Sequence, residues 1–163
     1  MSPPDTRFSA PPFHLAFAVD ELSSTRQFYG DCLGCSEGRS SASWVDFDFF
    51  GHQITAHVVG GATIQAPTNP VDGDRVPIPH FGVVLPWKQW EALAERLREH
   101  AIPFLIGPRI RFQGGAGEQG TFFIRDPSGN HLEFKFFHDL NGMFAEESDQ
   151  PSDGTNSPLE SLN

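Results

Sequence analysis

The chain has 163 residues, of which 38% are hydrophobic, and a formal net charge of −10. This length is sufficient for one domain with a core of its own. The sequence has no basic patch to neutralise phosphates and no apolar run of membrane-spanning length, so we expect neither a nucleic-acid nor a membrane partner. The N-terminus lacks the charged and apolar regions of a signal peptide, and we therefore expect a cytoplasmic protein.

Composition divides the chain into a leader, one domain and a tail. The domain splits into two halves joined by a segment rich in Gly, Pro and Asn, which is typical of a connection. The tail is acidic and has too few apolar residues to fold alone, so we expect it to be disordered. The expected divisions are an irregular leader over 1–12, a single domain over 13–138 (module one about 13–60, linker about 61–78, module two about 79–138) and the acidic tail over 139–163.

The first half opens with a strand from Phe13 to Val19, where apolar residues alternate with small or polar ones. A helix follows and runs to about Leu33; Asp20 or Ser23 is its expected cap, and Gly34 is a natural stop. Three further strands are expected at residues 36–39, 44–50 and 53–59.

The second half repeats this order. A strand over 79–85 is followed by a helix over 87–101, and then by strand-forming residues. The best-defined stretch is the end of this half, where a turn built from Asp, Pro, Ser, Gly and Asn separates two strands. The later strands are expected at residues 102–105, 109–112, 121–124 and 131–137, with a Gly-rich loop over 113–120.

Aligning the two halves brings out three residues with metal-ligand chemistry. His14 and His80 take equivalent positions on equivalent first strands, each on the face opposite its own helix. Glu133 lies on the corresponding face of the last strand, because it alternates with large apolar neighbours. If the two sheets curl around a shared cleft, the three side chains converge. Two imidazoles and one carboxylate form a mixed nitrogen and oxygen site for a divalent transition ion.

The same alignment bears on a fourth ligand. The repeat partner of Glu133 is Thr55, a poor ligand for such ions, so we expect three protein ligands with water or substrate filling the rest. His57 pairs with Lys135, two residues further along the same face. His57 is therefore either a pocket residue that shuttles a proton or binds substrate, or a partly buried structural histidine.

Cys32 and Cys35 form a C-x-x-C motif, which in other contexts signals a redox centre or half of a zinc site. The chain has no second pair of cysteines to complete a zinc site. We therefore favour the view that both are small buried hydrophobic residues.

From Phe13 to Phe137 the sequence resembles the vicinal oxygen chelate superfamily, which groups glyoxalase I, bleomycin-resistance proteins, fosfomycin-modifying enzymes and extradiol dioxygenases. The resemblance rests on His14, on STRQFYGDCLG (24–34), on His80 and on FFIRDPSGNHLEF (122–134). It implies an α+β fold of paired βαβββ modules that form a curved, partly open mixed β-barrel with flanking helices.

The resemblance also implies a cofactor and site residues. The cofactor is one divalent ion per site (Fe, Mn, Zn, Ni or Co), held by His14, His80 and Glu133, which chelates vicinal oxygens of a small-molecule substrate. Many two-module relatives form dimers with sites built across the interface, so the resemblance implies a homodimer. His14 would join His80 and Glu133 either within one chain or from the partner chain. We assign catalytic roles to Glu133 and His57. The expected substrate-binding residues are His57, Arg111, Phe123 and Lys135.

Three functions remain open at this stage. The favoured one is a metal-dependent lyase or isomerase of glyoxalase type, although glyoxalase I-like members usually have a carboxylate at the position of Thr55. The second is an Fe(II)-dependent dioxygenase, although extradiol enzymes usually have Tyr where Phe123 stands. The third is a non-catalytic, bleomycin-resistance-like ligand-binding protein. Arg109 and Arg111 either clamp a substrate carboxylate or are solvated strand residues.

Overall fold

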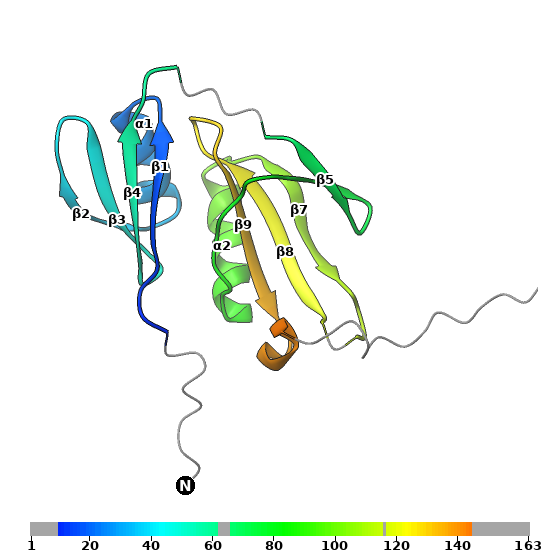
Figure 1. Ribbon diagram of the computed structural model, residues 1–163. Helices are drawn as coiled ribbons and strands as arrows, with labels where there is room; N and C mark the ends of the chain where they lie inside the picture. Colours follow the sequence, from blue (N-terminus) through cyan, green and yellow to red (C-terminus); the bar gives the residue numbers. More distant parts are fainter. Residues whose placement is uncertain (1–9, 62–65, 116, 145–163) are drawn as a thin grey trace, which may run out of the picture.

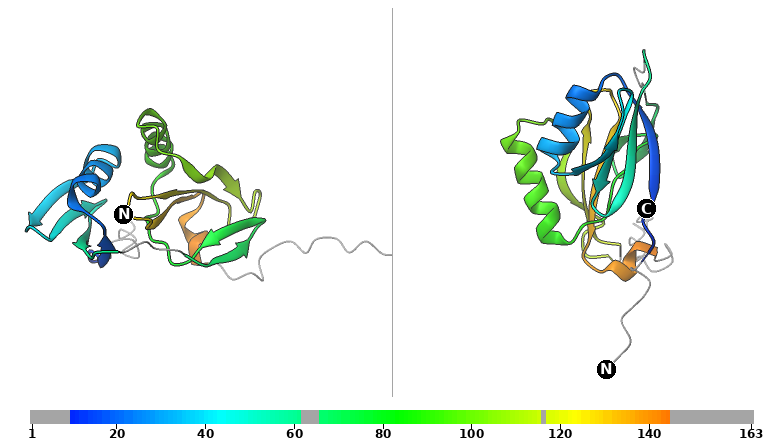
Figure 2. Two further views of the ribbon diagram at one scale, coloured as in Figure 1. Left: turned by 90° about the horizontal axis from the view of Figure 1, so that it is seen from above. Right: turned by 90° about the vertical axis from the view of Figure 1, so that its left-hand side faces the viewer.

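The computed structural model describes residues 10–61, 66–115 and 117–144. They form two main sheets that lie side by side, each with a helix on the same side, and a separate two-stranded hairpin (Figures 1 and 2). In chain order the elements are β1 His14–Val19, α1 Leu22–Arg26, the π-helical η2 Gln27–Cys32, β2 Ser36–Ser40, β3 Trp44–Phe49, β4 His52–Val58, β5 Thr68–Val71, β6 Asp74–Pro77, α2 Trp87–Glu99, β7 Phe104–Arg111, β8 Gln119–Arg125, β9 His131–Phe137 and the 3-10 helix η3 Leu140–Phe144.

The repeat expected from the sequence is visible in how the strands pair. The first sheet has the order β1-β4-β3-β2, with β1 parallel to β4, and the second has the order β7-β8-β9. Residues 79–85 run parallel to β9 as β1 runs along β4. They form no continuous strand, but backbone hydrogen bonds join them to β9, among them Glu133 N–H to the Phe81 carbonyl at 2.9 Å and Leu85 N–H to the Lys135 carbonyl at 2.7 Å. The α+β class and the curved, partly open arrangement are confirmed.

The first helix begins differently from the prediction. Neither Asp20 nor Ser23 is its cap: Glu21 has the extended backbone of a cap residue, and its carboxylate accepts the backbone N–H of Ser24 at 2.8 Å. Gly34 follows the helical segment with φ +80°, so it is the stop that the sequence predicts.

The core lies between the helices and the sheets. One face of α2, made of Trp90, Leu93, Ala94 and Leu97, is buried. The Trp90 indole also donates to the backbone carbonyl of Phe134 at 2.9 Å, which fixes α2 on β9. Burying such side chains is the main stabilising contribution to the fold.

The turn between β8 and β9 joins the two modules. The Asp126 carboxylate accepts backbone N–H groups of Ser128 and Asn130, and also the hydroxyl of Tyr29 at 3.0 Å. Asn130 Nδ2 donates to the carbonyl of Ala18 at 2.9 Å. A motif that reads as turn chemistry in the sequence therefore also holds module one against module two.

The segment between the modules contains an element that the sequence analysis did not anticipate. Strands β5 and β6 pair as an antiparallel hairpin. The hairpin lies across the second sheet on the face opposite α2 (Figure 2, left). Likewise, the strands predicted at 102–105 and 109–112 fall at the two ends of one continuous strand, β7, which covers Phe104–Arg111 and pairs irregularly with β8. Most of the expected leader (1–9) and tail (145–163) lies outside the described residues.

Candidate metal centre

His80 and Glu133 meet on the face of the second sheet that lies opposite α2. In each module we call the face opposite the helix the open face; in module two the β5–β6 hairpin lies across part of it and contacts β7. His80 Nε2 lies 3.0 Å from Glu133 Oε2, and His80 Nδ1 lies 2.7 Å from the carbonyl oxygen of Pro77 at the end of β6. A carbonyl can only accept, so Nδ1 carries a proton and Nε2 is the nitrogen available to a metal. The imidazole also packs edge-on against Phe123, with ring centroids 5.1 Å apart. These contacts fix the orientation of the ring.

Gly82 allows residues 79–85 to approach β9 this closely. A Cβ atom at Gly82 would lie 1.6 Å from the carbonyl oxygen of Glu133, which no side chain can tolerate. Glycine at this position therefore permits the pairing that places His80 beside Glu133.

The Glu133 carboxylate is itself held in place. Its oxygen Oε1 accepts the hydroxyl of Thr121 at 2.6 Å, while Lys135 Nζ lies 3.6 Å from Oε2. The residue is only 7% exposed. One oxygen is thus oriented by a neutral donor, and the other faces His80.

The electrostatics of the pair favour charge on both partners. The hydrogen bond with Glu133 raises the pKa of His80 above its usual value, against the burial that lowers it. Burial alone would raise the pKa of Glu133, but the hydrogen bonds from His80 and Thr121 and the charge of Lys135 outweigh it, so this pKa is lowered. In the absence of a metal the pair is therefore an ion pair over part of the acidic range.

His14, the third expected ligand, is exposed on β1. Within residues 10–61, 66–115 and 117–144 of one chain, no three His, Cys, Asp or Glu side chains gather closely enough to hold a metal. The arrangement of the sheets gives the reason. Both helices lie on the same side, so the two open faces point the same way instead of facing each other (Figure 2).

The other predicted residues fall into two groups. His57 is exposed on β4, with its ring 6.5 Å from that of Trp44, so it lies on module one and apart from the His80–Glu133 pair. Phe123, Lys135 and Arg111 all belong to the second sheet: Phe123 is fully buried against His80, and Arg111 is 5% exposed. Burial of Arg111 excludes the view that it is a solvated strand residue.

Sequence reasoning assigned no role to Thr121 or to the Pro77 carbonyl, which orient the two central side chains. It also assigned none to Asp46, a buried carboxylate on β3 that accepts the hydroxyl of Thr55 at 2.6 Å. A signal for Asp46 was present, because it alternates with apolar residues on β3 and so shares the face of Thr55.

A cavity of about 240 Å³ adjoins His80 at the seam between the modules. It is lined mainly by apolar side chains from β1 and from the start of the 79–85 segment. The lining residues are Leu15, Ala16, Phe17, Pro79, His80, Phe81, Asn130 and His131. A small apolar group could therefore lie beside His80.

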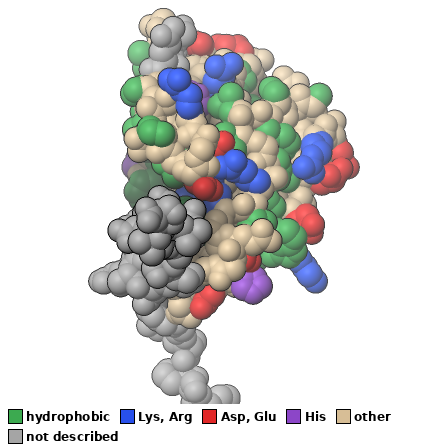
Figure 3. All heavy atoms as spheres, turned by 90° about the vertical axis from the view of Figure 1, so that its right-hand side faces the viewer, with side chains coloured by type: hydrophobic (Ala, Val, Ile, Leu, Met, Phe, Trp, Pro, Cys, Tyr) green, Lys and Arg blue, Asp and Glu red, His purple; other side chains and the backbone are tan. Residues whose placement is uncertain are grey.

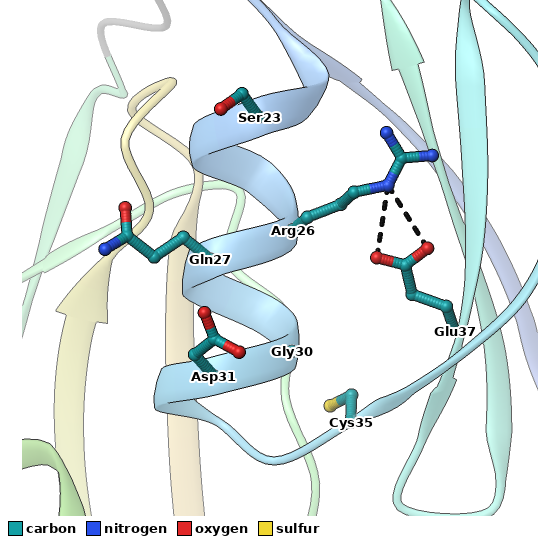
Figure 4. Close-up of a pocket in the computed structure, with 7 residues that line it drawn as sticks. All are labelled: Ser23, Arg26, Gln27, Gly30, Asp31, Cys35 and Glu37. Atoms are coloured by element: carbon teal, nitrogen blue, oxygen red, sulfur yellow. Dashed lines mark hydrogen bonds and ion pairs between the residues drawn. The ribbon is translucent and has the colours of Figure 1, made fainter.

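A second hollow lies beside the first helix, away from the His80–Glu133 pair. Figure 4 shows Arg26 turned toward Glu37 there, with Arg26 Nε 3.1 Å from the carboxylate. Cys35 lines this hollow but is buried, and burial raises its pKa to about 12. Cys32 is buried too, and burial raises its pKa. Because the thiolate is the reactive form, these values agree with the expected structural role of both cysteines.

The helices among the described residues are too short or too polar to cross a membrane. A search of curated proteins found no match to the chain.

Comparison with solved structures and with protein families places the fold. A glyoxalase/bleomycin resistance protein/dioxygenase from Alicyclobacillus acidocaldarius is 32% identical, with a TM-score of 0.68 over 85% of this chain and 99% of that one. Two more distant structures share the fold. The fosfomycin resistance protein FosX from Listeria monocytogenes is 19% identical, with a TM-score of 0.59 over 82% of this chain and 97% of that one. Lactoylglutathione lyase from Agrobacterium tumefaciens is 16% identical, with a TM-score of 0.55 over 84% of this chain and 100% of that one. A family model described as Glyoxalase/Bleomycin resistance protein/Dioxygenase superfamily matches residues 12–134. The chain therefore belongs to the glyoxalase/bleomycin resistance protein/dioxygenase superfamily.

Proposed function

We propose that this protein is a metal-dependent enzyme that chelates two neighbouring oxygens of a small substrate, and that it acts as a lyase or isomerase of glyoxalase type. The observation that supports this best is the His80–Glu133 pair, with 3.0 Å between Nε2 and Oε2. Each partner is oriented by a further hydrogen bond, to Pro77 and from Thr121. Metal-ligating histidines and carboxylates characteristically have such outer contacts.

The proposed third ligand is His14 from a second copy of the chain. Two-fold symmetry can place the open face of sheet one in one copy over the open face of sheet two in the other, which creates two equivalent sites. His57 lies on the same open face as His14. Ala18 pairs with His57 across β1 and β4, and His14 shares the face of Ala18 because the two are an even number of residues apart on β1. The dimer would thus bring both histidines to the His80–Glu133 pair. The donor set fits Fe, Mn, Zn, Ni or Co.

When bound, such an ion would polarise a substrate carbonyl or hydroxyl and stabilise the oxyanion that forms. The chain itself would supply proton transfer and exclude water. Glu133 Oε2 is the proposed proton acceptor, and His57 of the second copy is the alternative. The hydrogen bonds from His80 and Thr121, with the charge of Lys135, favour the ionised form of Glu133, and the buried Phe123 shields the centre from solvent.

Elemental analysis of protein purified without oxygen or added metal tests the centre. We expect about one ion per chain in the wild type, because each chain contributes one Glu133 and a dimer therefore has two sites. The His80→Ala and Glu133→Ala variants should lose the ion. His100→Ala is the matched control, because His100 is exposed at the end of α2 and should keep the ion. A wild type that neither carries nor takes up metal overturns the enzyme proposal and favours the ligand-binding protein.

The identity of the metal separates the two enzymatic possibilities. Zn, Ni, Co or Mn with turnover of α-ketoaldehyde–thiol adducts supports the glyoxalase-type reaction. Iron with oxygen consumption on catechols favours the Fe(II)-dependent dioxygenase instead.

Complementation tests whether the site crosses the dimer. His14→Ala and Glu133→Ala homodimers should each be inactive, but a heterodimer of the two has one site with both native ligands. Random mixing should restore about a quarter of wild-type activity, because half of the dimers are mixed and each has one intact site. No recovery, with exchange of subunits verified, would refute a shared site.

A further inference from the structure

The β5–β6 hairpin is tied to two arginines on the open face of the second sheet. Asp74 in the hairpin lies 2.7 Å (Oδ2) from Arg111 Nη2, and Arg109 Nη2 contacts the same oxygen. Arg109 Nη2 also donates to the backbone carbonyl of Asp72 at 2.9 Å. On the side of the molecule that faces β7 and the hairpin, acidic and basic side chains lie in contact (Figure 3). One carboxylate oxygen thus serves two guanidinium groups.

The arginines have more donors than the hairpin satisfies. Arg111 is 95% buried by residue, yet its Nε has no hydrogen-bond partner among the described residues, and the same holds for the buried Nε of Arg109. A buried, unpaired N–H of a charged group is costly, and native structures rarely retain one without a use. Both unpaired groups are suited to an oxyanion with several acceptor oxygens, such as a carboxylate or a phosphonate.

Strand register connects the arginines to the candidate metal centre. Arg109 lies opposite Thr121, and Thr121 lies opposite Lys135, so these three side chains form a row across β7, β8 and β9. Glu133 lies on the same face, two residues before Lys135. Two strand spacings across and two residues along the strand separate the backbones of Glu133 and Arg109 by roughly 12 Å. Side chains stand roughly perpendicular to a sheet, so a substrate that reaches both Glu133 and Arg109 must span a distance of this order.

We propose that Arg109 and Arg111 form the subsite for an anionic group of the substrate, and that Asp74 occupies this subsite until the substrate displaces it. The substrate class is then a small molecule with metal-chelating oxygens at one end and a carboxylate or phosphonate at the other. This rests on the proposed function, which places the reacting end at His80 and Glu133. Displacement of Asp74 also releases the hairpin from the face that it covers.

The alternative is that Asp74 only fixes the hairpin. The two roles predict different anion affinities once the charge of Asp74 is removed. If Asp74 competes with an anion, Asp74→Asn should bind anions more tightly than the wild type; if it is only structural, anion affinity should not rise.

Calorimetric titration of the metal-free full-length protein with malonate and with methylphosphonate separates these roles. We expect Asp74→Asn to bind at least one of these probes about 10- to 100-fold more tightly than the wild type, which is the range for a charge-assisted contact. Tightening for malonate alone assigns a carboxylate, and tightening for methylphosphonate alone assigns a phosphonate. Asp72→Asn is the matched control, because its more exposed carboxylate lies 3.7 Å from Arg109, and it should behave as the wild type.

Adding Arg109→Gln to Asp74→Asn should abolish the gain. Arg109 is preferred for this test because it is more exposed than Arg111, so its replacement is better tolerated. Equal affinity of wild type and Asp74→Asn for both probes, or a gain that survives Arg109→Gln, overturns the subsite. Because EDTA-treated protein is used, the result is independent of metal binding: a failed metal titration overturns the proposed function but leaves the anion measurement standing.

Discussion

The hydrogen bond from Thr121 to Glu133 offers a direct test of the metal centre. Thr121→Val removes the hydroxyl while keeping the branched shape of a fully buried side chain. Glu133 Oε1 then loses the donor at 2.6 Å, so the carboxylate is no longer held toward His80 and its pKa rises. Loss of such an outer contact lowers metal affinity about 10- to 100-fold, which corresponds to about 1.4–2.7 kcal/mol.

Isothermal titration of the metal-free protein with Zn²⁺ or Co²⁺ measures this change. Thr25→Val is the matched control: the Thr25 hydroxyl is equally buried and donates at 2.6 Å, but to the backbone carbonyl of Glu21 in the first helix. That variant should lose stability without losing metal affinity. An unchanged affinity in Thr121→Val, or equal losses in both variants, would show that Thr121 does not orient a metal ligand.

Three further predictions concern stability and pH. Tyr29→Phe should lower the free energy of unfolding by about 1.5–2 kcal/mol in urea denaturation, because a donor to the buried Asp126 is lost while other donors remain; a loss below about 0.5 kcal/mol would contradict this. Gly82→Ala should lower the free energy of unfolding by about 3 kcal/mol and weaken metal binding, because its Cβ would collide with the backbone of Glu133. Gly107→Ala is the control: its Cβ would meet open space, so the same denaturation assay should show almost no change. In metal-free protein, the difference in free energy of unfolding between wild type and His80→Gln should be greatest between about pH 4.5 and 6.5. Because the pKa of His80 is raised, the stability that His80 contributes is lost as pH rises through that pKa. Because the pKa of Glu133 is lowered, the stability that Glu133 contributes is lost as pH falls through that pKa. Urea melts across pH measure this, and a flat difference would refute the ion pair.

The meeting of His80 with Glu133 could be anticipated from the sequence. The alternation around Glu133 fixes the face on which its side chain lies, and the internal repeat fixes which strand runs beside β9. Neither inference requires knowledge of side-chain packing. The first-helix cap was missed because three neighbouring residues can all accept a backbone N–H, and only the backbone angles at Glu21 decide between them.

The hairpin and its contacts could not be anticipated in the same way. Its strands contain Pro70 and Pro77 and show little apolar alternation, so composition indicates a connection rather than strands. The hydrogen bond from Arg111 to Asp74 joins residues 37 positions apart and depends on where the hairpin folds back, which no local pattern specifies. Whether His14 meets its partners within one chain also depends on how whole sheets are placed.

A comparison of the two modules explains why their contributions to the centre differ. Each open face has a buried threonine that donates to a carboxylate at 2.6 Å, but the positions are exchanged between strands. In module two the carboxylate, Glu133, is on β9, directly beside the segment that bears His80. In module one the carboxylate, Asp46, is on β3, with β4 between it and the strand of His14. Only module two therefore pairs a carboxylate with a histidine, and module one is left to offer a histidine alone. This asymmetry is consistent with the proposed donor set of two imidazoles and one carboxylate, whereas a fully symmetric repeat would offer four ligands.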